Sequence, residues 1–176
     1  MYWIHGNNDN FDAIASGDLP AELHHIENGT AIEIGALRVA GLGGTFAPTW
    51  YETPARDLPH PKKGTAKATE LADKRRHFVR EDVERAAALG GIDVFMSHEA
   101  AKPFRPFPGG RGPDAGKAQI NEILRAMRPR LHLFGHHHRF SEQTVEGVRS
   151  IGLDLVSRSC VLIRLPGLDV SLVESA

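Results

Sequence analysis

Cysteine, long apolar runs and excess charge are all scarce in this chain of 176 residues. Its single cysteine, Cys160, excludes an internal disulfide and favours a reducing compartment, and we expect it to be a small core residue. No apolar run approaches the ~18 residues of a membrane-spanning helix. The formal net charge of -1 provides no general attraction to nucleic acid or anionic lipid. We therefore expect one cytoplasmic domain over residues 1–176, without a membrane or nucleic-acid partner.

The order of the predicted elements is typical of an α/β protein. Apolar spacing predicts helices at residues 11–16, 75–91 and 117–129, and strands at residues 2–4, 36–42, 92–96 and 131–134. Asn28-Gly29 predicts a hairpin turn, and several short strands are expected after residue 140. Because a helix precedes a short apolar strand twice, we expect an α/β layer. The hairpin and the strand-rich tail indicate a second, mixed sheet.

Polar side chains follow three of the predicted strands. Asn7 and Asp9 follow the first, His98 follows the strand at residues 92–96, and His136 and His138 follow the strand at residues 131–134. In open α/β sheets, ligands bind outside the carboxyl ends of the strands, so parallel neighbours would bring these side chains to one rim. A turn at Gly135 would aim His136 and His138 the same way, with His137 pointing elsewhere. Imidazole and amide or carboxylate oxygens together indicate Mn, Fe, Zn or Ni.

Each cluster alone also has a structural interpretation. Asn, Asp and Gly are common in turns, a single histidine after a strand is more often a core residue, and three histidines can be a surface tract. The coincidence of all three clusters at strand ends favours a metal site. A closed structural zinc site usually contains cysteine, so a simple metal-binding module ranks last. The remaining histidines are expected to be structural or solvated: His5, His24, His25, His60, His77 and His132.

These blocks resemble the calcineurin-like metallophosphoesterase family. The resemblance rests on Gly6-Asn7-Asn8-Asp9, Ser97-His98-Glu99 and Gly135-His136-His137-His138, in the family's order and with its wide gaps. It implies a sandwich of two mixed β-sheets flanked by helices. The family's two earlier blocks, Asp-x-His and Gly-Asp, are absent here. We therefore expect an N-terminally incomplete domain that lacks the first strand-helix-strand portion.

The resemblance also implies roles for individual residues. Asn7, His98 and His136 would bind one metal ion, and His138 would bind a second, so the cofactor is one or two divalent transition metal ions. Asn8, Asp9 and His137 are the expected catalytic residues. The implied reaction is hydrolysis of small-molecule or nucleotide phosphomonoesters or phosphodiesters by a metal-bound hydroxide. Arg105 and Arg111, in the Pro/Gly-rich loop after His98, would hold the phosphate, although a solvated basic loop is an equal interpretation.

Two departures from the family keep an alternative open. The missing blocks would supply most ligands of the second metal, and Asn8 replaces a histidine that is a candidate proton donor. Loss of acid catalysis commonly costs about 10²–10⁴-fold, least where the leaving group is good. The alternative function is therefore a non-catalytic scaffold or protein-interaction domain on the same fold. An uncovered sheet edge at the shortened start would also favour a homo-oligomer.

Overall fold

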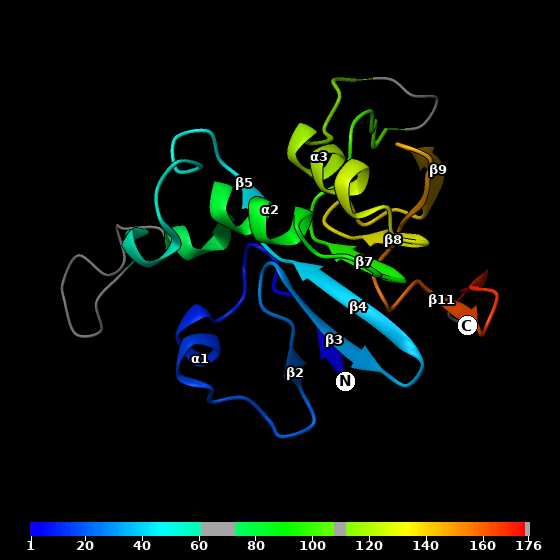
Figure 1. Ribbon diagram of the computed structural model, residues 1–176, viewed down its shortest axis with the longest axis horizontal. Helices are drawn as coiled ribbons and strands as arrows, with labels where there is room; N and C mark the ends of the chain where they lie inside the picture. Colours follow the sequence, from blue (N-terminus) through cyan, green and yellow to red (C-terminus); the bar gives the residue numbers. More distant parts are fainter. Residues whose placement is uncertain (61–72, 108–111, 175–176) are drawn as a thin grey trace.

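A six-stranded mixed β-sheet forms the centre of the computed structural model, which describes residues 1–60, 73–107 and 112–174 (Figure 1). The strand order is β3 (Thr30–Ile34), β4 (Leu37–Leu42), β7 (Val94–Ser97), β8 (Leu131–Phe134), β10 (Val148–Gly152) and β9 (Ser141–Val145). The four inner strands are parallel, and the outer strands β3 and β9 are antiparallel to their neighbours. The chain is therefore an α/β protein, as its sequence predicts.

Two amphipathic helices cover one face of this sheet, and Figure 1 shows them on the same side. They are α2 (Arg80–Ala87) and α3 (Ala118–Met127). Their buried side chains, including Val83, Ile120 and Leu124, pack with Phe95 of β7 in one apolar cluster. Burying an aliphatic or aromatic side chain of this size stabilises the fold by about 1.5–3 kcal/mol. The helices therefore hold the central strands in a fixed position.

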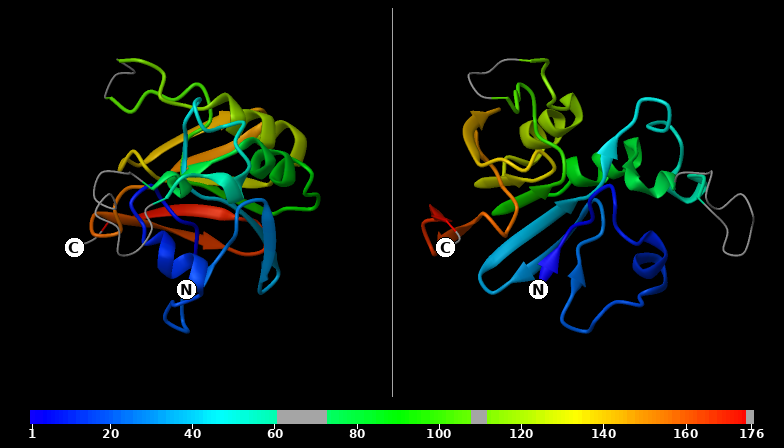
Figure 2. Two further views of the ribbon diagram at one scale, coloured as in Figure 1. Left: turned by 90° about the vertical axis from the view of Figure 1, so that its left-hand side faces the viewer. Right: turned by 180° about the vertical axis from the view of Figure 1, so that it is seen from behind.

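Two short strand pairs lie against the opposite face. They are the parallel pair β1 (Tyr2–Trp3) with β2 (His24–His25), and the antiparallel pair β11 (Ser159–Arg164) with β12 (Asp169–Glu174). Val161 and Ile163 of β11, together with Ile4 directly after β1, pack with Leu131 and Ile151 of the main sheet. Figure 2 shows the layers from the side and from behind. The main sheet is thus buried on both faces.

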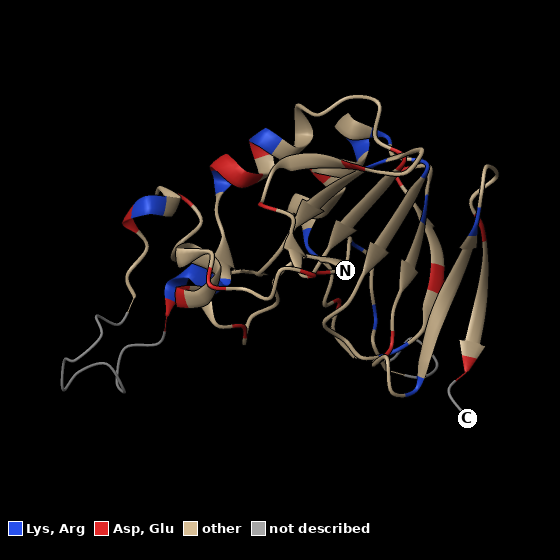
Figure 3. Ribbon diagram, turned by 90° about the horizontal axis from the view of Figure 1, so that it is seen from below, with Lys and Arg blue, Asp and Glu red and all other residues tan. Residues whose placement is uncertain are grey.

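The remaining elements are short and lie around the carboxyl ends of the central strands. They are α1 (Phe11–Ser16), the parallel pair β5 (Thr45–Phe46) with β6 (His77–Phe78), and 3-10 turns at Ala55–Asp57 and Lys74–Arg76. In Figure 3, Lys and Arg are interleaved with Asp and Glu over the helices. Among the described residues, no helix is long and apolar enough to cross a membrane.

Several predicted elements are confirmed. The helix at residues 11–16 is present, and Asn10 caps it because its Oδ1 accepts from the Ala13 amide at 3.1 Å. The strand at residues 131–134 has the predicted bounds, and the helix expected at 117–129 spans Ala118–Met127. The strand expected at 92–96 is shifted to Val94–Ser97. Four short strands follow residue 140, as expected.

The predicted position of the hairpin turn is wrong. The hairpin joins β3 to β4 through Gly35-Ala36, where Gly35 has a φ of +61°. Asn28 instead uses its side chain to bind the loop after β4, since its Oδ1 accepts from the Gly43 amide at 2.6 Å. The strand before Asn28, β2, pairs with β1. The hairpin is consequently part of the main sheet and not of a second one.

The long helix predicted at residues 75–91 is also wrong in its first half. Phe78 belongs to a strand and pairs with Phe46, so the helix begins only at Arg80. Asp82 fixes this start because its Oδ2 accepts from the Val79 amide at 3.0 Å. The core position expected for Cys160 is wrong as well. β11 alternates between inward and outward side chains, and Cys160 lies on the exposed side.

Candidate metal centre

Two of the three predicted polar clusters leave the sheet side by side. β7 and β8 are parallel neighbours, and Ser97 is aligned with Phe134 at their carboxyl ends. The residues that follow are His98 and the Gly135-His136 segment, so both emerge at the same edge. The His98 amide also donates to the Leu42 carbonyl at 3.0 Å, which fixes its backbone to the end of β4.

The third cluster reaches this edge from a different layer. β1 is not a strand of the main sheet, so the expectation that it lies beside β7 and β8 in one sheet is wrong. The loop after β1 instead passes against the ring of His98. A Cβ on Gly6 would lie 2.9 Å from Cε1 of His98, so only glycine permits this approach. The Asp9 carboxylate accepts from the Gly6 amide and closes the loop.

Asn7 and His136 both approach Nε2 of His98, and we call these three residues the triad. Nε2 of His98 lies 3.0 Å from Oδ1 of Asn7 and 3.0 Å from Nδ1 of His136. Ligand atoms at about 2.1 Å from an ion and at the right angles of octahedral coordination lie about 3.0 Å apart. A nitrogen with one hydrogen or one lone pair cannot satisfy two such neighbours, whereas a cation takes a lone pair from each atom. The donor set therefore fits a divalent transition metal.

The environment keeps the central imidazole neutral. Burial lowers the pKa of His98 from 6.5 to about 4, and the nearby His136 lowers it further in the same direction. A neutral ring has a free lone pair, which metal binding requires. The Asp9 carboxylate opposes this shift only weakly. At neutral pH the His98 ring is thus ready to bind a cation without first losing a proton.

The backbone after β8 is bent into an unusual conformation. His136 has a φ of +64° and His138 a φ of +48°, and both values lie in the left-handed region that non-glycine residues rarely adopt. The His137 amide donates to the Gly135 carbonyl at 2.7 Å, which closes a tight turn. Such strain costs about 1–3 kcal/mol per residue and is concentrated at functional sites. The turn therefore depends on two histidines rather than on Gly135, where it was expected.

The other two histidines of this segment make different contacts from those of the triad. His138 is exposed, and no hydrogen bond joins it to Asn7, His98 or His136 within the described ranges. The ring of His137 packs on Phe104, with 4.6 Å between the ring centroids. Burial, followed by the charge of His136, lowers the pKa of His137 to about 4. A second metal site around His138 and a catalytic role of His137 stay predictions.

The predicted polar residues of the first loop have identified partners. Oδ1 of Asn8 accepts from Nη2 of Arg76 at 3.1 Å, and Asp9 holds the loop closed as described. Arg105 lies in the loop after His98, where its Nη1 donates to the Gly112 carbonyl at 2.9 Å. Arg111 lies outside the described residues.

Arg76 is a basic residue of the site that no sequence pattern identifies. A cavity of about 260 Å³ runs along the loop Asn7 to Asp12 and is bounded on the other side by Arg75 and Arg76. Arg75 is held by Asp12 and by Asp73, so Arg76 is the guanidinium beside Asn8. In the sequence it is the second residue of the helix predicted at residues 75–91, and nothing there distinguishes it from a solvated helix residue.

The metal-binding capacity of the described residues is limited to a small donor set. In these ranges no three His, Cys, Asp or Glu side chains are grouped so that they could hold an ion. The triad consists of two imidazoles and one amide oxygen, and it offers three protein ligands. A site with three protein ligands leaves positions open for water or substrate, as in catalytic sites.

Comparisons with known proteins extend the description of the fold. No family model matches the chain, and no curated protein matches it in sequence. A solved crystal structure is similar over 99% of this chain and 65% of its own length, with a TM-score of 0.69 and 12% identity. The chain has a known fold. It also resembles TT1561 of Thermus thermophilus, with a TM-score of 0.62, 13% identity and coverage of 98% and 71%.

The coverage values show that this chain spans less than the whole of these relatives. It corresponds to about two thirds of the first structure's length. At 12% and 13% identity the likeness concerns the fold alone, because one fold hosts many functions. The function must therefore be argued from the triad and its surroundings.

Proposed function

We propose that this chain forms a metal-dependent phosphoesterase site on a metallophosphoesterase-like fold. The observation that supports the proposal is the convergence of Asn7 Oδ1, His98 Nε2 and His136 Nδ1, with 3.0 Å between successive atoms. These residues come from three separate segments: His98 and His136 follow β7 and β8 of the main sheet, and Asn7 follows β1 of the small parallel pair. The resemblance in sequence blocks then assigns the same three side chains to one ion.

The chemistry depends on which groups the chain provides. A divalent Mn, Fe, Zn or Ni ion held by the triad would supply a Lewis acid that neutralises phosphate charge and lowers the pKa of water. Arg76 neutralises further charge on a phosphate in the cavity beside Asn7, since guanidinium binds phosphate oxygens with parallel hydrogen bonds. Asn8 accepts from Arg76 through Oδ1, so its amide Nδ2 is the group that donates to the substrate.

Asn8 has no proton that it can donate to a leaving group, and this limits the class of substrate. An amide does not release a proton near neutral pH, so this residue does not assist a poor leaving group. Activated phosphodiesters and phosphomonoesters have weakly basic leaving groups, which depart without such assistance. We therefore expect hydrolysis of these esters and slow hydrolysis of unactivated alkyl phosphates.

One observation favours the alternative, a non-catalytic scaffold on the same fold. His138, the residue expected to bind a second ion, is exposed and is not joined to the triad in the described part of the chain. A single ion without acid catalysis would give weak activity. The scaffold and the enzyme differ in one measurable property, which is turnover in the presence of bound metal.

Metal content and hydrolysis of bis(p-nitrophenyl) phosphate test the proposal together. The wild type is compared with Asn7→Ala, His98→Ala and His136→Ala, and with His60→Ala as an exposed-histidine control. Mn²⁺ and Zn²⁺ affinities are measured by isothermal titration calorimetry after dialysis against chelator. We expect each triad variant to lose at least about tenfold in metal affinity and to lose hydrolysis in parallel, because each removes one ligand.

The outcomes separate the two functions. Equal metal affinity in His98→Ala, His136→Ala and the wild type would refute the metal centre. Metal binding that depends on the triad, without hydrolysis of the diester under saturating metal, would favour the scaffold. Unchanged properties of His60→Ala show that the losses come from the triad and not from the removal of any imidazole.

A further inference from the structure

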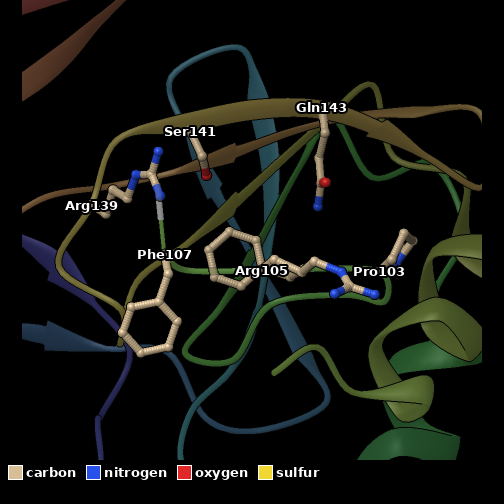
Figure 4. Close-up of a pocket in the computed structure, with 7 residues that line it drawn as sticks. Pro103, Arg105, Phe107, Arg139, Ser141 and Gln143 are labelled. Carbon is tan, nitrogen blue, oxygen red and sulfur yellow. The ribbon is translucent and has the colours of Figure 1, made fainter. Parts of the chain in front are cut away.

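A second cavity, separate from the triad, lies between the loop after β7 and strand β9 (Figure 4). Its volume is about 310 Å³. The loop contributes one wall, and the segment from Arg139 to Gln143 contributes the other. The residues that line it are Pro103, Phe104, Arg105, Phe107, Arg139, Ser141 and Gln143. The second wall therefore begins at Arg139, the residue directly after the three histidines.

Two guanidinium groups give this cavity a positive charge. Nη1 of Arg139 donates to the Pro106 carbonyl at 2.6 Å, and Nη1 of Arg105 donates to the Gly112 carbonyl at 2.9 Å. Each bond holds its guanidinium at the wall, and a guanidinium has five N–H donors in all. Among the described residues that line the cavity there is no carboxylate. The cavity is therefore suited to an anion.

Two buried polar atoms on β9 lack partners. Oγ of Ser141 and Nε2 of Gln143 are inaccessible to solvent and make no hydrogen bond within the part of the chain that is described. They are two residues apart on one strand and so project from the same face, and Figure 4 shows both directed into the cavity. Leaving such a group unsatisfied costs about 1–3 kcal/mol. A ligand with acceptor oxygens would remove this cost once the two side chains rotate to expose these atoms to the cavity.

Aromatic rings connect the cavity to the triad. Phe104 lines the cavity and packs on His137, with 4.6 Å between the ring centroids. The ring of His137 lies 5.0 Å from the ring of His136, which belongs to the triad. Phe107, on the same loop, is 57% exposed and offers an apolar surface at the cavity. A molecule can therefore contact both places only if an organic linker separates its two binding groups.

We propose that this cavity binds a second phosphate group of a substrate whose reacting phosphate lies at the triad. Phosphate oxygens are acceptors only. They match the donors of this cavity, which are the guanidinium of Arg139, the side-chain amide of Gln143 and the hydroxyl of Ser141. The substrate class is accordingly an organic bisphosphate with an apolar or aromatic linker. The link to the reacting phosphate depends on the proposed function, whereas anion binding in the cavity does not.

Binding is tested first without metal, so that the result is independent of hydrolysis. Adenosine 3′,5′-bisphosphate is titrated calorimetrically in chelator into the wild type, Arg139→Met and Gln143→Leu. Arg164→Met is the control, since Arg164 is an exposed arginine on β11 away from the cavity. Loss of one charge-assisted hydrogen-bond donor is expected to weaken binding by about 10–100-fold for Arg139→Met. Gln143→Leu should weaken it less, and Arg164→Met should not weaken it.

Hydrolysis with Mn²⁺ tests the link to the triad. Both phosphates of the bisphosphate are on unactivated ribose oxygens, so its hydrolysis is expected to be slow and is followed over long incubations. The ratio of kcat/KM for the bisphosphate to kcat/KM for p-nitrophenyl phosphate should nevertheless fall by about 10–100-fold in Arg139→Met. Circular dichroism confirms that both cavity variants fold. No binding by the wild type, or equal binding by Arg139→Met and Arg164→Met, overturns the proposal. Arg139-dependent binding without hydrolysis of p-nitrophenyl phosphate retains the anion site and refutes the proposed function instead. An unchanged ratio in Arg139→Met overturns the link between the cavity and the triad.

Discussion

Acidification should destabilise this protein through one buried histidine that lies outside the triad. His132 of β8 is fully buried, and its ring stacks on Phe95 with 5.3 Å between the centroids. Nε2 lies 2.7 Å from Oγ of Ser97, and Nδ1 lies 3.0 Å from Oγ of Ser150. The Ser97 hydroxyl donates to the Glu99 carbonyl, so it accepts from Nε2–H and holds the ring in one neutral tautomer. Burial lowers the pKa of His132 from 6.5 to about 3.

The magnitude follows from the two pKa values. Above pH 6.5 the ring is neutral in both the folded and the unfolded state, and the contribution to stability is fully present. Below pH 6.5 the unfolded chain gains a proton that the folded chain excludes, so the free energy of unfolding falls by about 1.4 kcal/mol per pH unit until about pH 3. Between pH 7.5 and pH 5.0 His132 alone should therefore remove about 2 kcal/mol.

Urea unfolding followed by circular dichroism measures this loss. The wild type and His132→Gln are compared in chelator at pH 7.5, 6.5 and 5.0, with His24→Gln as an exposed control. Other titrating groups contribute equally to all three proteins, so the difference in slope isolates the buried ring. We expect His132→Gln to lose about 2 kcal/mol less than the wild type over this range, whatever its stability at pH 7.5. Parallel curves for the wild type and His132→Gln would refute the reasoning.

Three further changes test other parts of the structure. Asp82→Ala removes the acceptor of the Val79 amide at the start of α2, and urea unfolding should show a loss of about 1–3 kcal/mol; an unchanged midpoint would contradict this. Gly6→Ala places a Cβ 2.9 Å from the His98 ring, and calorimetry should show Mn²⁺ affinity lowered by about tenfold, whereas equal affinity would show that the loop can move away. Cys160 should react fully with Ellman's reagent in the folded protein, and a protected thiol would contradict its exposed position.

Local signals predicted some elements because the same residues form them in the structure. Asn10 caps α1 through its own side chain, and the apolar run from Leu131 to Phe134 is a buried parallel strand. The hairpin failed for a different reason. The Asn28 side chain binds the Gly43 amide, 15 residues away, and this tertiary contact determines its conformation. The start of α2 failed because Phe78 pairs with a strand that no local pattern indicates.

In the candidate site, too, some residues could be predicted from the sequence and others depend on tertiary contacts. Strand-end placement was sufficient to group His98 and His136, since β7 and β8 are parallel neighbours. For Asn7 the expected contact is present but the reason was wrong, because β1 belongs to a separate strand pair and its loop reaches His98 from another layer. Strand-end placement was not sufficient to identify Arg76 or Arg139. Each is placed by a contact with a distant segment. Arg76 donates to Asn8, and Arg139 donates to the Pro106 carbonyl. Spacing along the chain contains no information on such contacts.

The wide separation of the triad along the chain has a consequence for how the protein is assembled. The contact between Asn7 and His98 joins residues 91 positions apart, and the contact between His98 and His136 joins residues 38 positions apart. No fragment shorter than the span from the first loop to the end of β8 contains all three groups. An ion that binds here would therefore recognise only the completed tertiary structure, and it would raise the melting temperature of the entire sheet rather than that of a single loop.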